Sequence, residues 1–168
     1  MPRGERTAAM WNDPARREVR IHAMRRHRAK SSNYSPEKYA HLDKLTVAER
    51  AYIAGFLDGE GHIGLARRKV VVTFTNTDRA VLEWMNALVG GFIAGHVHSG
   101  PPRKPTYRLV LSHCNAIELI LRVRPYLRIN SGQADVVVEF WRNRFVSWGG
   151  YEGAKASITH LNRRGVAA

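Results

Sequence analysis

Two acidic residues separated by a single glycine, Asp58 and Glu60, end an otherwise apolar stretch of the chain. The stretch has the pattern of a helix, so both carboxylates fall in its last turn, where the helix dipole disfavours negative charge. If two copies of this helix meet, the carboxylates of both chains converge, and like charges that close stay ionised only with a proton or cation between them. A hard divalent cation such as Mg²⁺, held by carboxylate oxygens and water, is the simplest resolution. An ordinary core helix with an acidic, glycine-containing end accounts for the same spacing.

The helix that must position these carboxylates has a clear start signal. Thr46 is followed three residues later by Glu49, the capping-box pattern, immediately before the apolar run. One face of the helix is apolar at positions i, i+3 and i+4 and is expected to enter a core. The residues of this apolar face are Ile53, Phe56 and Leu57.

The opposite stripe of the same helix consists of small residues at every fourth position, namely Ala51, Gly55 and Gly59. Glycine in a helix interior costs about 1 kcal/mol relative to alanine. Small residues at this spacing allow two helices to approach backbone to backbone. Close packing against a second copy of the same helix is therefore expected to compensate the cost.

Residues 53–61, Ile-Ala-Gly-Phe-Leu-Asp-Gly-Glu-Gly, resemble the nine-residue signature of the LAGLIDADG homing endonucleases, position by position. The resemblance implies that the motif helices form the subunit interface and that a saddle of antiparallel strands straddles double-stranded DNA. It implies that Glu60 binds the catalytic metal, Mg²⁺ or Mn²⁺, that Gly59 contributes a nearby carbonyl, and that Asp58 shapes the helix end. The implied dimer interface comprises Ala51, Gly55, Asp58 and Gly59. Because the chain has one motif, the active unit is expected to be a homodimer.

The charge balance agrees with a nucleic-acid partner. The chain carries 27 Lys and Arg residues against 14 Asp and Glu residues, a net charge of +13, as expected of a protein that binds a polyanion. An anionic membrane is the rival partner, but the sequence has no long apolar run and no lipid-facing amphipathic helix. A merely soluble basic protein would have the same balance. The single cysteine, Cys114, and the lack of an apolar signal segment after Met1 favour a cytoplasmic location, close to the nucleoid.

After residue 61 the hydrophobic period alternates between helix and strand. The predicted order is α-β-β-α-β-β-α-α, an α+β fold with an antiparallel saddle backed by helices, as the resemblance implies for residues 46–145. The expected strands are 62–66, 70–77, 92–98 and 106–113, and the later helices are 79–89, 115–124 and 133–145. In the helix at 115–124, Ile117, Ile120 and Leu121 are expected to point inward.

One face of the predicted sheet and its loops carries basic and hydroxyl side chains that can reach phosphates and base edges. A solvated sheet face explains the same alternation. The His-x-His pair at residues 96–98 also raises the question of zinc, but its spacing matches no common closed site. The expected DNA-binding residues are His62, Arg67, Arg68, Lys69, Thr73, Thr75, His96, His98, Arg103, Lys104 and Arg108.

The chain departs from the family pattern at one catalytic position. Family members usually carry a lysine just before the last motif-domain helix, where this chain has Asn130, with Arg128 two residues earlier. Asn76 falls where the family often has a glutamine that orders water. The expected catalytic set is therefore Glu60, Asn76, Arg128 and Asn130. Asparagine cannot supply positive charge to the transition state, so a binding-only relative stays open beside a site-specific endonuclease that leaves short 3′ overhangs. An RNA-binding maturase that assists intron splicing is a further alternative.

Two segments flank the predicted motif domain. Residues 1–45 are expected to form a basic arm and linker, partly disordered, with a helix at 14–28 that contacts phosphate on DNA. A solvated, partly disordered tail explains the same composition. Residues 146–168 are expected to form a basic extension, with a break up to Gly153 and a short helix at 154–164. The host element, whether an intron, an intein or a free-standing gene of a phage or bacterial mobile element, is not encoded in these patterns.

Overall fold

The computed structural model describes residues 36–96, 104–143 and 150–163. The expected helix at 14–28, together with His98 and Arg103, lies outside these residues. The fold is α+β, and the expected order of helices and strands is confirmed. In chain order the elements are η1 (Pro36–Lys44), α3 (Val47–Glu60), β1 (Gly61–Ala66), β2 (Lys69–Asn76), α4 (Arg79–Val89), β3 (Phe92–His96), β4 (Thr106–Ser112), α5 (Cys114–Val123), η2 (Arg124–Tyr126), α6 (Ser131–Asn143) and α7 (Gly150–Arg163).

The four strands form one antiparallel sheet in the order β1-β2-β4-β3. The β1–β2 hairpin aligns Ile63 with Val72, and the central β2–β4 pair aligns Phe74 with Leu109. All four of these side chains are buried. Because neighbouring side chains on a strand point to opposite faces, this register gives the sheet one apolar face and one open face.

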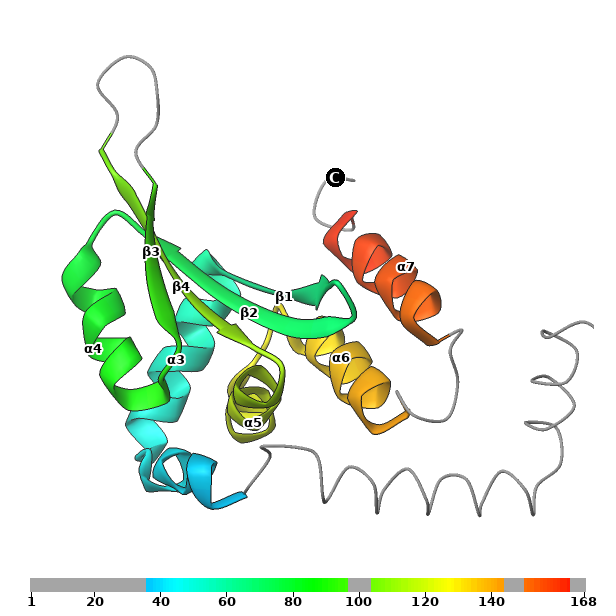
Figure 1. Ribbon diagram of the computed structural model, residues 1–168, viewed down its shortest axis with the longest axis horizontal. Helices are drawn as coiled ribbons and strands as arrows, with labels where there is room; N and C mark the ends of the chain where they lie inside the picture. Colours follow the sequence, from blue (N-terminus) through cyan, green and yellow to red (C-terminus); the bar gives the residue numbers. More distant parts are fainter. Residues whose placement is uncertain (1–35, 97–103, 144–149, 164–168) are drawn as a thin grey trace, which may run out of the picture.

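The helices α3, α4, α5 and α6 lie against the apolar face of the sheet (Figure 1). Their buried residues recur at helical spacing, as in α4, where Leu82, Met85 and Val89 are fully buried. Asp78 begins α4 by accepting a hydrogen bond from the Ala80 N–H (2.9 Å). The expected layer of helices behind a saddle is therefore present.

Three local expectations were wrong. Leu121 is 44% exposed, whereas Leu119 and Val123 of α5 are fully buried, because the face of α5 toward the core is rotated from the one that Ile117, Ile120 and Leu121 define. Helix α6 begins at Ser131, two residues early, since the Ala134 N–H already bonds the Asn130 carbonyl (3.0 Å). Helix α7 begins at Gly150, within the stretch expected to be a break.

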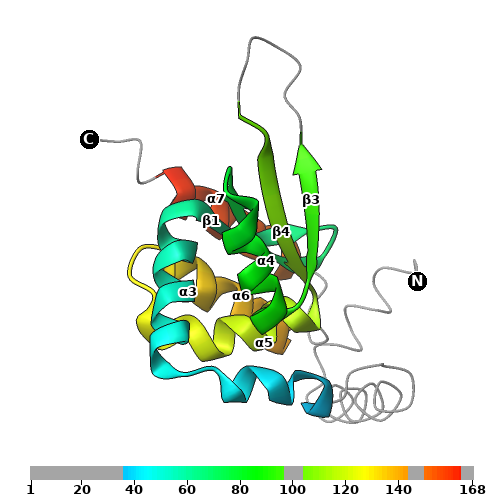
Figure 2. The same ribbon diagram turned by 90° about the vertical axis from the view of Figure 1, so that its left-hand side faces the viewer.

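Both flanking segments contribute to the core. Leu42 of η1 is fully buried and Leu45 is 5% exposed, and η1 runs under α5 at the base of the helical layer (Figure 2). At the other end of the chain, α7 packs along α6 through Ile158, which is 5% exposed. The packed unit therefore extends on both sides of residues 46–145. Within the described residues, no helix combines the length and the apolar character needed to cross a membrane.

Candidate functional site

The motif helix α3 is fixed at both ends. At its start, the Thr46 N–H donates to the Glu49 carboxylate (2.7 Å) and the Glu49 N–H donates to the Thr46 hydroxyl (3.2 Å), which confirms the capping box. These bonds lower the pKa of Glu49 below its ordinary value. At its end, the Gly61 N–H donates to the Leu57 carbonyl. A Cβ atom at Gly61 would lie 2.4 Å from the Leu57 side chain and 2.7 Å from its backbone, so only glycine allows strand β1 to start directly after the helix.

Glu60 is the last residue of α3 and is exposed. Its carboxylate makes no hydrogen bond or ion pair within the part of the chain that the structure describes. Gly59 is exposed as well, with open space around its Cα. A carboxylate at a helix C-terminus is electrostatically unfavourable. Glu60 therefore has no structural role that the described contacts account for.

Asp58, two residues earlier, is in a different environment. Its carboxylate accepts the backbone N–H of Arg128 (2.7 Å) and the backbone N–H of Asn130 (2.8 Å). The Asn130 side-chain amide in turn donates to the Leu57 carbonyl (2.8 Å). These three bonds tie the end of α3 to the segment that begins α6. Asp58 and Asn130 thus hold the site together, while the side chain of Arg128 stays exposed.

Replacing Asp58 with alanine is expected to lower the free energy of unfolding by about 2 kcal/mol, because two hydrogen bonds to a charged acceptor are lost. Asp58→Asn keeps one acceptor oxygen but turns an NH2 donor toward the other backbone N–H, so it is expected to cost about as much as the alanine substitution. Urea denaturation of the three proteins measures both values. An Asp58→Ala protein as stable as the parent would show that these bonds do not support the fold.

Asn76 lies at the same end of the sheet as Glu60. Strand β1 begins opposite Phe74, with Gly61 as its partner, so Asn76 lies two residues beyond the start of β1. Its side-chain oxygen accepts the Asp78 N–H (2.8 Å), which starts the turn into α4. The structure thus brings the four expected catalytic residues, Glu60, Asn76, Arg128 and Asn130, to one end of α3.

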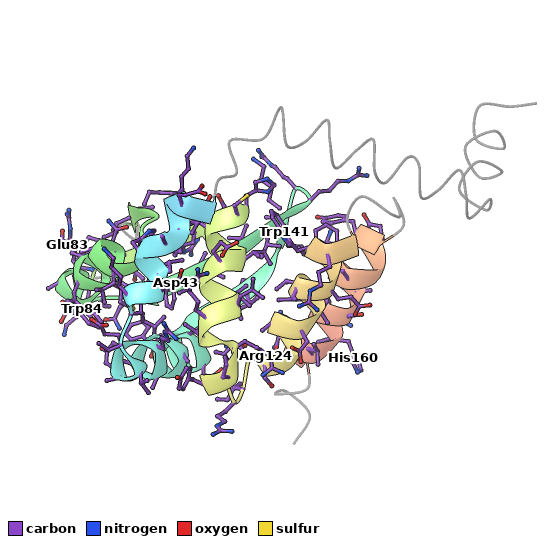
Figure 3. The ribbon with its side chains drawn as sticks, turned by 90° about the horizontal axis from the view of Figure 1, so that it is seen from below. Asp43, Glu83, Trp84, Arg124, Trp141 and His160 are labelled. Atoms are coloured by element: carbon purple, nitrogen blue, oxygen red, sulfur yellow. The ribbon has the colours of Figure 1, made fainter. Side chains whose placement is uncertain are left out.

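The small-residue stripe of α3 faces outward. Ala51, Gly55 and Gly59 are exposed, and a Cβ atom at either glycine would meet nothing within 4 Å. Two aromatic residues continue this surface: Tyr52 is 48% and Trp84 is 43% exposed, and their rings meet edge to face at 5.3 Å. They line an apolar groove of about 500 Å³ between α3 and α4, and Trp84 projects from α4 at the edge of the molecule (Figure 3).

Sequence reasoning missed Tyr52 and Trp84. The available signal was that both aromatic residues lie off the apolar stripes of their own helices, Ile53–Phe56–Leu57 in α3 and Val81–Leu82–Met85–Leu88 in α4. Exposed aromatic side chains that lie together, as Tyr52 and Trp84 do, indicate a contact surface.

The open face of the sheet is free of negative charge. No residue of strands β1 to β4 is Asp or Glu, while Lys69 and Arg108 are exposed cations on that face. The register places Thr75 opposite Arg108 and Thr73 opposite His62. Of the other expected DNA-binding residues, Arg67 and Arg68 form the β1–β2 turn, Lys104 is exposed just before β4, and the backbone of His96 ends β3.

The His62 ring lies over Gly64, where an added Cβ would come within 2.5 Å of its Nε2 atom. Desolvation by burial lowers the pKa of His62 below its ordinary value. The lowered pKa favours the uncharged ring, which can donate one hydrogen bond and accept another.

The donor set at the end of α3 fits a hard divalent cation. The Glu60 carboxylate and the Gly59 carbonyl are oxygen donors, which Mg²⁺ prefers. Among the described residues, no group of three or more His, Cys, Asp or Glu side chains forms a metal-binding cluster. One chain thus offers a single unengaged carboxylate here, and a second copy would add another.

Comparisons with known proteins place this geometry in a family. A family model for the LAGLIDADG-like domain matches residues 48–131, half of the chain. No curated protein matches the chain in sequence. Among solved structures, the homing endonuclease I-CvuI in complex with its target in the presence of Ca is 16% identical, with 68% of this chain and 80% of that chain covered and a TM-score of 0.53.

Two further solved structures give similar values. I-CvuI in complex with the I-CreI target in the presence of Mg, with the DNA not cleaved, is 17% identical over 68% of this chain and 82% of that chain, with a TM-score of 0.52. The archaeal intron-encoded homing endonuclease I-Vdi141I complexed with DNA is 19% identical over 69% and 83%, with a TM-score of 0.53. At these identities the likeness establishes a shared fold. With its motif helix, its four-stranded antiparallel saddle and the family match, the chain belongs to the LAGLIDADG homing endonuclease family.

Proposed function

We propose that this protein is a site-specific double-strand DNA endonuclease that acts as a homodimer. The observation that carries the proposal is the position of Glu60: an exposed carboxylate, unengaged by the described residues, next to a sheet face that has cations and no carboxylate. A negative group at that edge has no partner within the described part of one chain. A scissile phosphate with its counter-cation would give it one.

The homodimer follows from the surface of α3. Two copies related by a twofold axis would pack their Ala51, Gly55 and Gly59 stripes together and bring two Glu60 side chains under one duplex. The exposed Tyr52–Trp84 surface lies beside this stripe and would be covered in part by the same contact. Burial of these two aromatic side chains would add apolar area that small residues alone cannot provide.

The residues of each subunit have separate tasks. Glu60, with the Gly59 carbonyl, would hold Mg²⁺ or Mn²⁺, which supplies an activated water and charge stabilisation on the leaving oxygen when bound. Asp58 and Asn130 hold the end of α3 in place through their hydrogen bonds. Arg128 is the nearest exposed cation to these residues in sequence and is the candidate to stabilise charge that develops on the phosphate. Asn76 would orient water through its amide group.

Binding to the duplex would use the open face of the sheet. The proposed contacts come from Lys69, Arg108 and the Arg67–Arg68 turn to phosphates, and from His62, Thr73 and Thr75 to base edges. Lys104, exposed just before β4, is proposed to contact the backbone as well. His96, His98 and Arg103 are proposed as contacts from the sequence. The protein would act in the cytoplasm, at the nucleoid of a cell that carries a mobile element.

A DNA-binding relative without cleavage is the second candidate, and one observation favours it. Asn130 occupies the position of the usual family lysine, and its side-chain amide is engaged with the Leu57 carbonyl. No cationic side chain thus stands at that position to assist the reaction.

Selection from a randomised duplex library with Mg²⁺ distinguishes the two candidates. The endonuclease is expected to enrich cleaved molecules that share a long, roughly palindromic site with short 3′ overhangs. Enrichment of bound, uncut molecules with such a site would support the binding-only protein. Enrichment of neither kind would contradict both.

A further inference from the structure

The turn between β1 and β2 is strained. Arg67 and Arg68 form its two central residues with φ angles of 47° and 63°, and the pair Ala66–Lys69 closes the hairpin. Positive φ at both positions is the geometry of a type I′ turn, which strongly favours Asn-Gly or Gly-Gly. Arginine adopts it at an energetic cost. Strain of this kind at a surface turn indicates that the side chains are kept for a function.

One of the two side chains is held by the C-terminal helix. The Arg68 guanidinium carbon lies 5.9 Å from the centre of the Tyr151 ring, within cation–π distance. Tyr151 is in the first turn of α7, and its ring meets the Phe140 ring of α6 edge to face at 6.0 Å. Since Phe140 is only 9% exposed, the tyrosine ring is supported by the core and is not a free surface group.

Helix α7 is anchored well enough to act as this support. The Gln133 side-chain amide donates to the Asn162 side-chain oxygen (3.2 Å), and Gln133 is 7% exposed. Leu161 packs so closely on Gly132 that an added Cβ there would lie 3.3 Å from it. The helix lies beside α6, near the turn end of β1 (Figure 1). It lies beyond residues 48–131, the part of the chain that the family model matches.

We propose that Tyr151 is a positioning residue for Arg68, and that α7 thereby takes part in DNA binding by orienting the β1–β2 turn on the phosphate backbone. The proposal rests on the proposed function, since it needs duplex DNA as the partner. Strand β1 begins directly after Glu60 and has six residues, so the turn lies about 20 Å from that carboxylate at ~3.3 Å per residue. Each DNA strand has one phosphate per ~3.4 Å of helix axis, so with β1 along the duplex axis the turn would reach the backbone about six base pairs from the cleavage centre.

A double-mutant cycle tests the coupling. Equilibrium binding to duplex DNA is measured as a function of salt for the parent, Arg68→Ala, Tyr151→Leu, the double variant, and Tyr151→Phe. Arg68→Ala is expected to weaken binding about tenfold and to reduce the slope of log K against log salt by about 1. Tyr151→Leu is expected to weaken binding about 3- to 5-fold, and Tyr151→Phe, which keeps the aromatic ring, less than about 2-fold. In the Arg68→Ala background, Tyr151→Leu is expected to have no further effect on binding.

The outcomes separate the inference from the function on which it rests. Tyr151→Leu could weaken DNA binding equally with and without Arg68, or the Tyr151→Phe protein could bind DNA as weakly as the Tyr151→Leu protein. In either case Tyr151 acts only through folding and the inference fails. If the parent binds duplex DNA and the Arg68→Ala protein binds it with the same affinity, the inference fails while the proposed function stands. A parent protein that does not bind duplex DNA at all contradicts the proposed function itself.

The strain has its own test. The double substitution Arg67→Asn, Arg68→Gly installs the preferred type I′ residues and is expected to raise Tm by about 2–6 °C while weakening DNA binding at least tenfold. Thermal unfolding and the same binding assay measure the two effects. A lower Tm would show that the two arginines do not destabilise the turn, and unchanged binding would show that they do not contribute to DNA binding.

Discussion

Replacing Glu60 with glutamine is expected to reduce DNA cleavage by at least ~10³-fold, the equivalent of about 4 kcal/mol in the barrier. Glutamine has nearly the same shape but no charge with which to hold a divalent cation. The fold should not suffer, because the Glu60 carboxylate makes no hydrogen bond or ion pair with the described residues. Removing a negative charge from a helix C-terminus is expected to raise the free energy of unfolding by about 0.3–1 kcal/mol.

DNA binding by the Glu60→Gln protein, measured with the metal chelated, is expected to equal or exceed that of the parent, because a negative charge near phosphate is gone. Glu139→Gln is the matched control: it removes the same charge from an exposed position on α6 and should leave cleavage unchanged. Plasmid cleavage and thermal unfolding are run on all three proteins. Equal cleavage by the Glu60→Gln protein and the parent would show that Glu60 is not a ligand of the catalytic metal.

Replacing Gly55 with leucine is expected to convert the proposed dimer to a monomer and so to abolish the proposed double-strand cleavage. Within one chain the position has room for a side chain, since an added Cβ has no neighbour within 4 Å. Leucine is also the better helix former by up to about 0.8 kcal/mol. Across a twofold axis, however, it would force the two helices apart by several ångströms. We expect the dissociation constant of the dimer to rise at least ~100-fold, or about 3 kcal/mol.

This variant separates assembly from folding more cleanly than a core substitution would. Sedimentation measures the mass, and thermal unfolding should show a fold at least as stable as that of the dissociated parent. Gly153→Leu is the matched control, because Gly153 lies in α7 and an added Cβ there also meets nothing within 4 Å. It should leave the mass of the dimer and cleavage unaltered. A Gly55→Leu protein that still sediments as a dimer would refute α3 as the subunit contact.

Much of the fold could be predicted from the sequence, because local signals and the global arrangement agree. The capping box at Thr46, the aspartate at the start of α4 and the alternation of Val72 and Phe74 with Thr73 each have a short-range cause that tertiary packing does not override. The errors arose where the deciding contact is distant. Leu121 fits an amphipathic stripe as well as Leu119 does, and only the position of α5 against η1 and α6 determines which of them is buried.

The residues of the candidate site could be predicted from the sequence, but the separate roles of Asp58 and Glu60 could not. Asp58 and Glu60 are two residues apart and chemically alike, yet one accepts two backbone N–H groups from a segment 70 residues later and the other faces solvent. Nothing in the local sequence distinguishes a carboxylate that supports the backbone from one that is open to a cation. The link from Arg68 to Tyr151 was invisible for the same reason, since it joins a hairpin turn to a helix more than 80 residues away.

The direct junction at Gly61 has a mechanical consequence. Helix α3 passes into strand β1 without a loop, and the Leu57 side chain fills the space where any larger residue would put its Cβ. A change in the angle between two motif helices would therefore rotate each sheet together with its helix as a rigid body. In a pair of such subunits, the angle at which the helices cross would set the distance between the two DNA half-sites. The dimer would then bind only targets whose half-sites have that spacing.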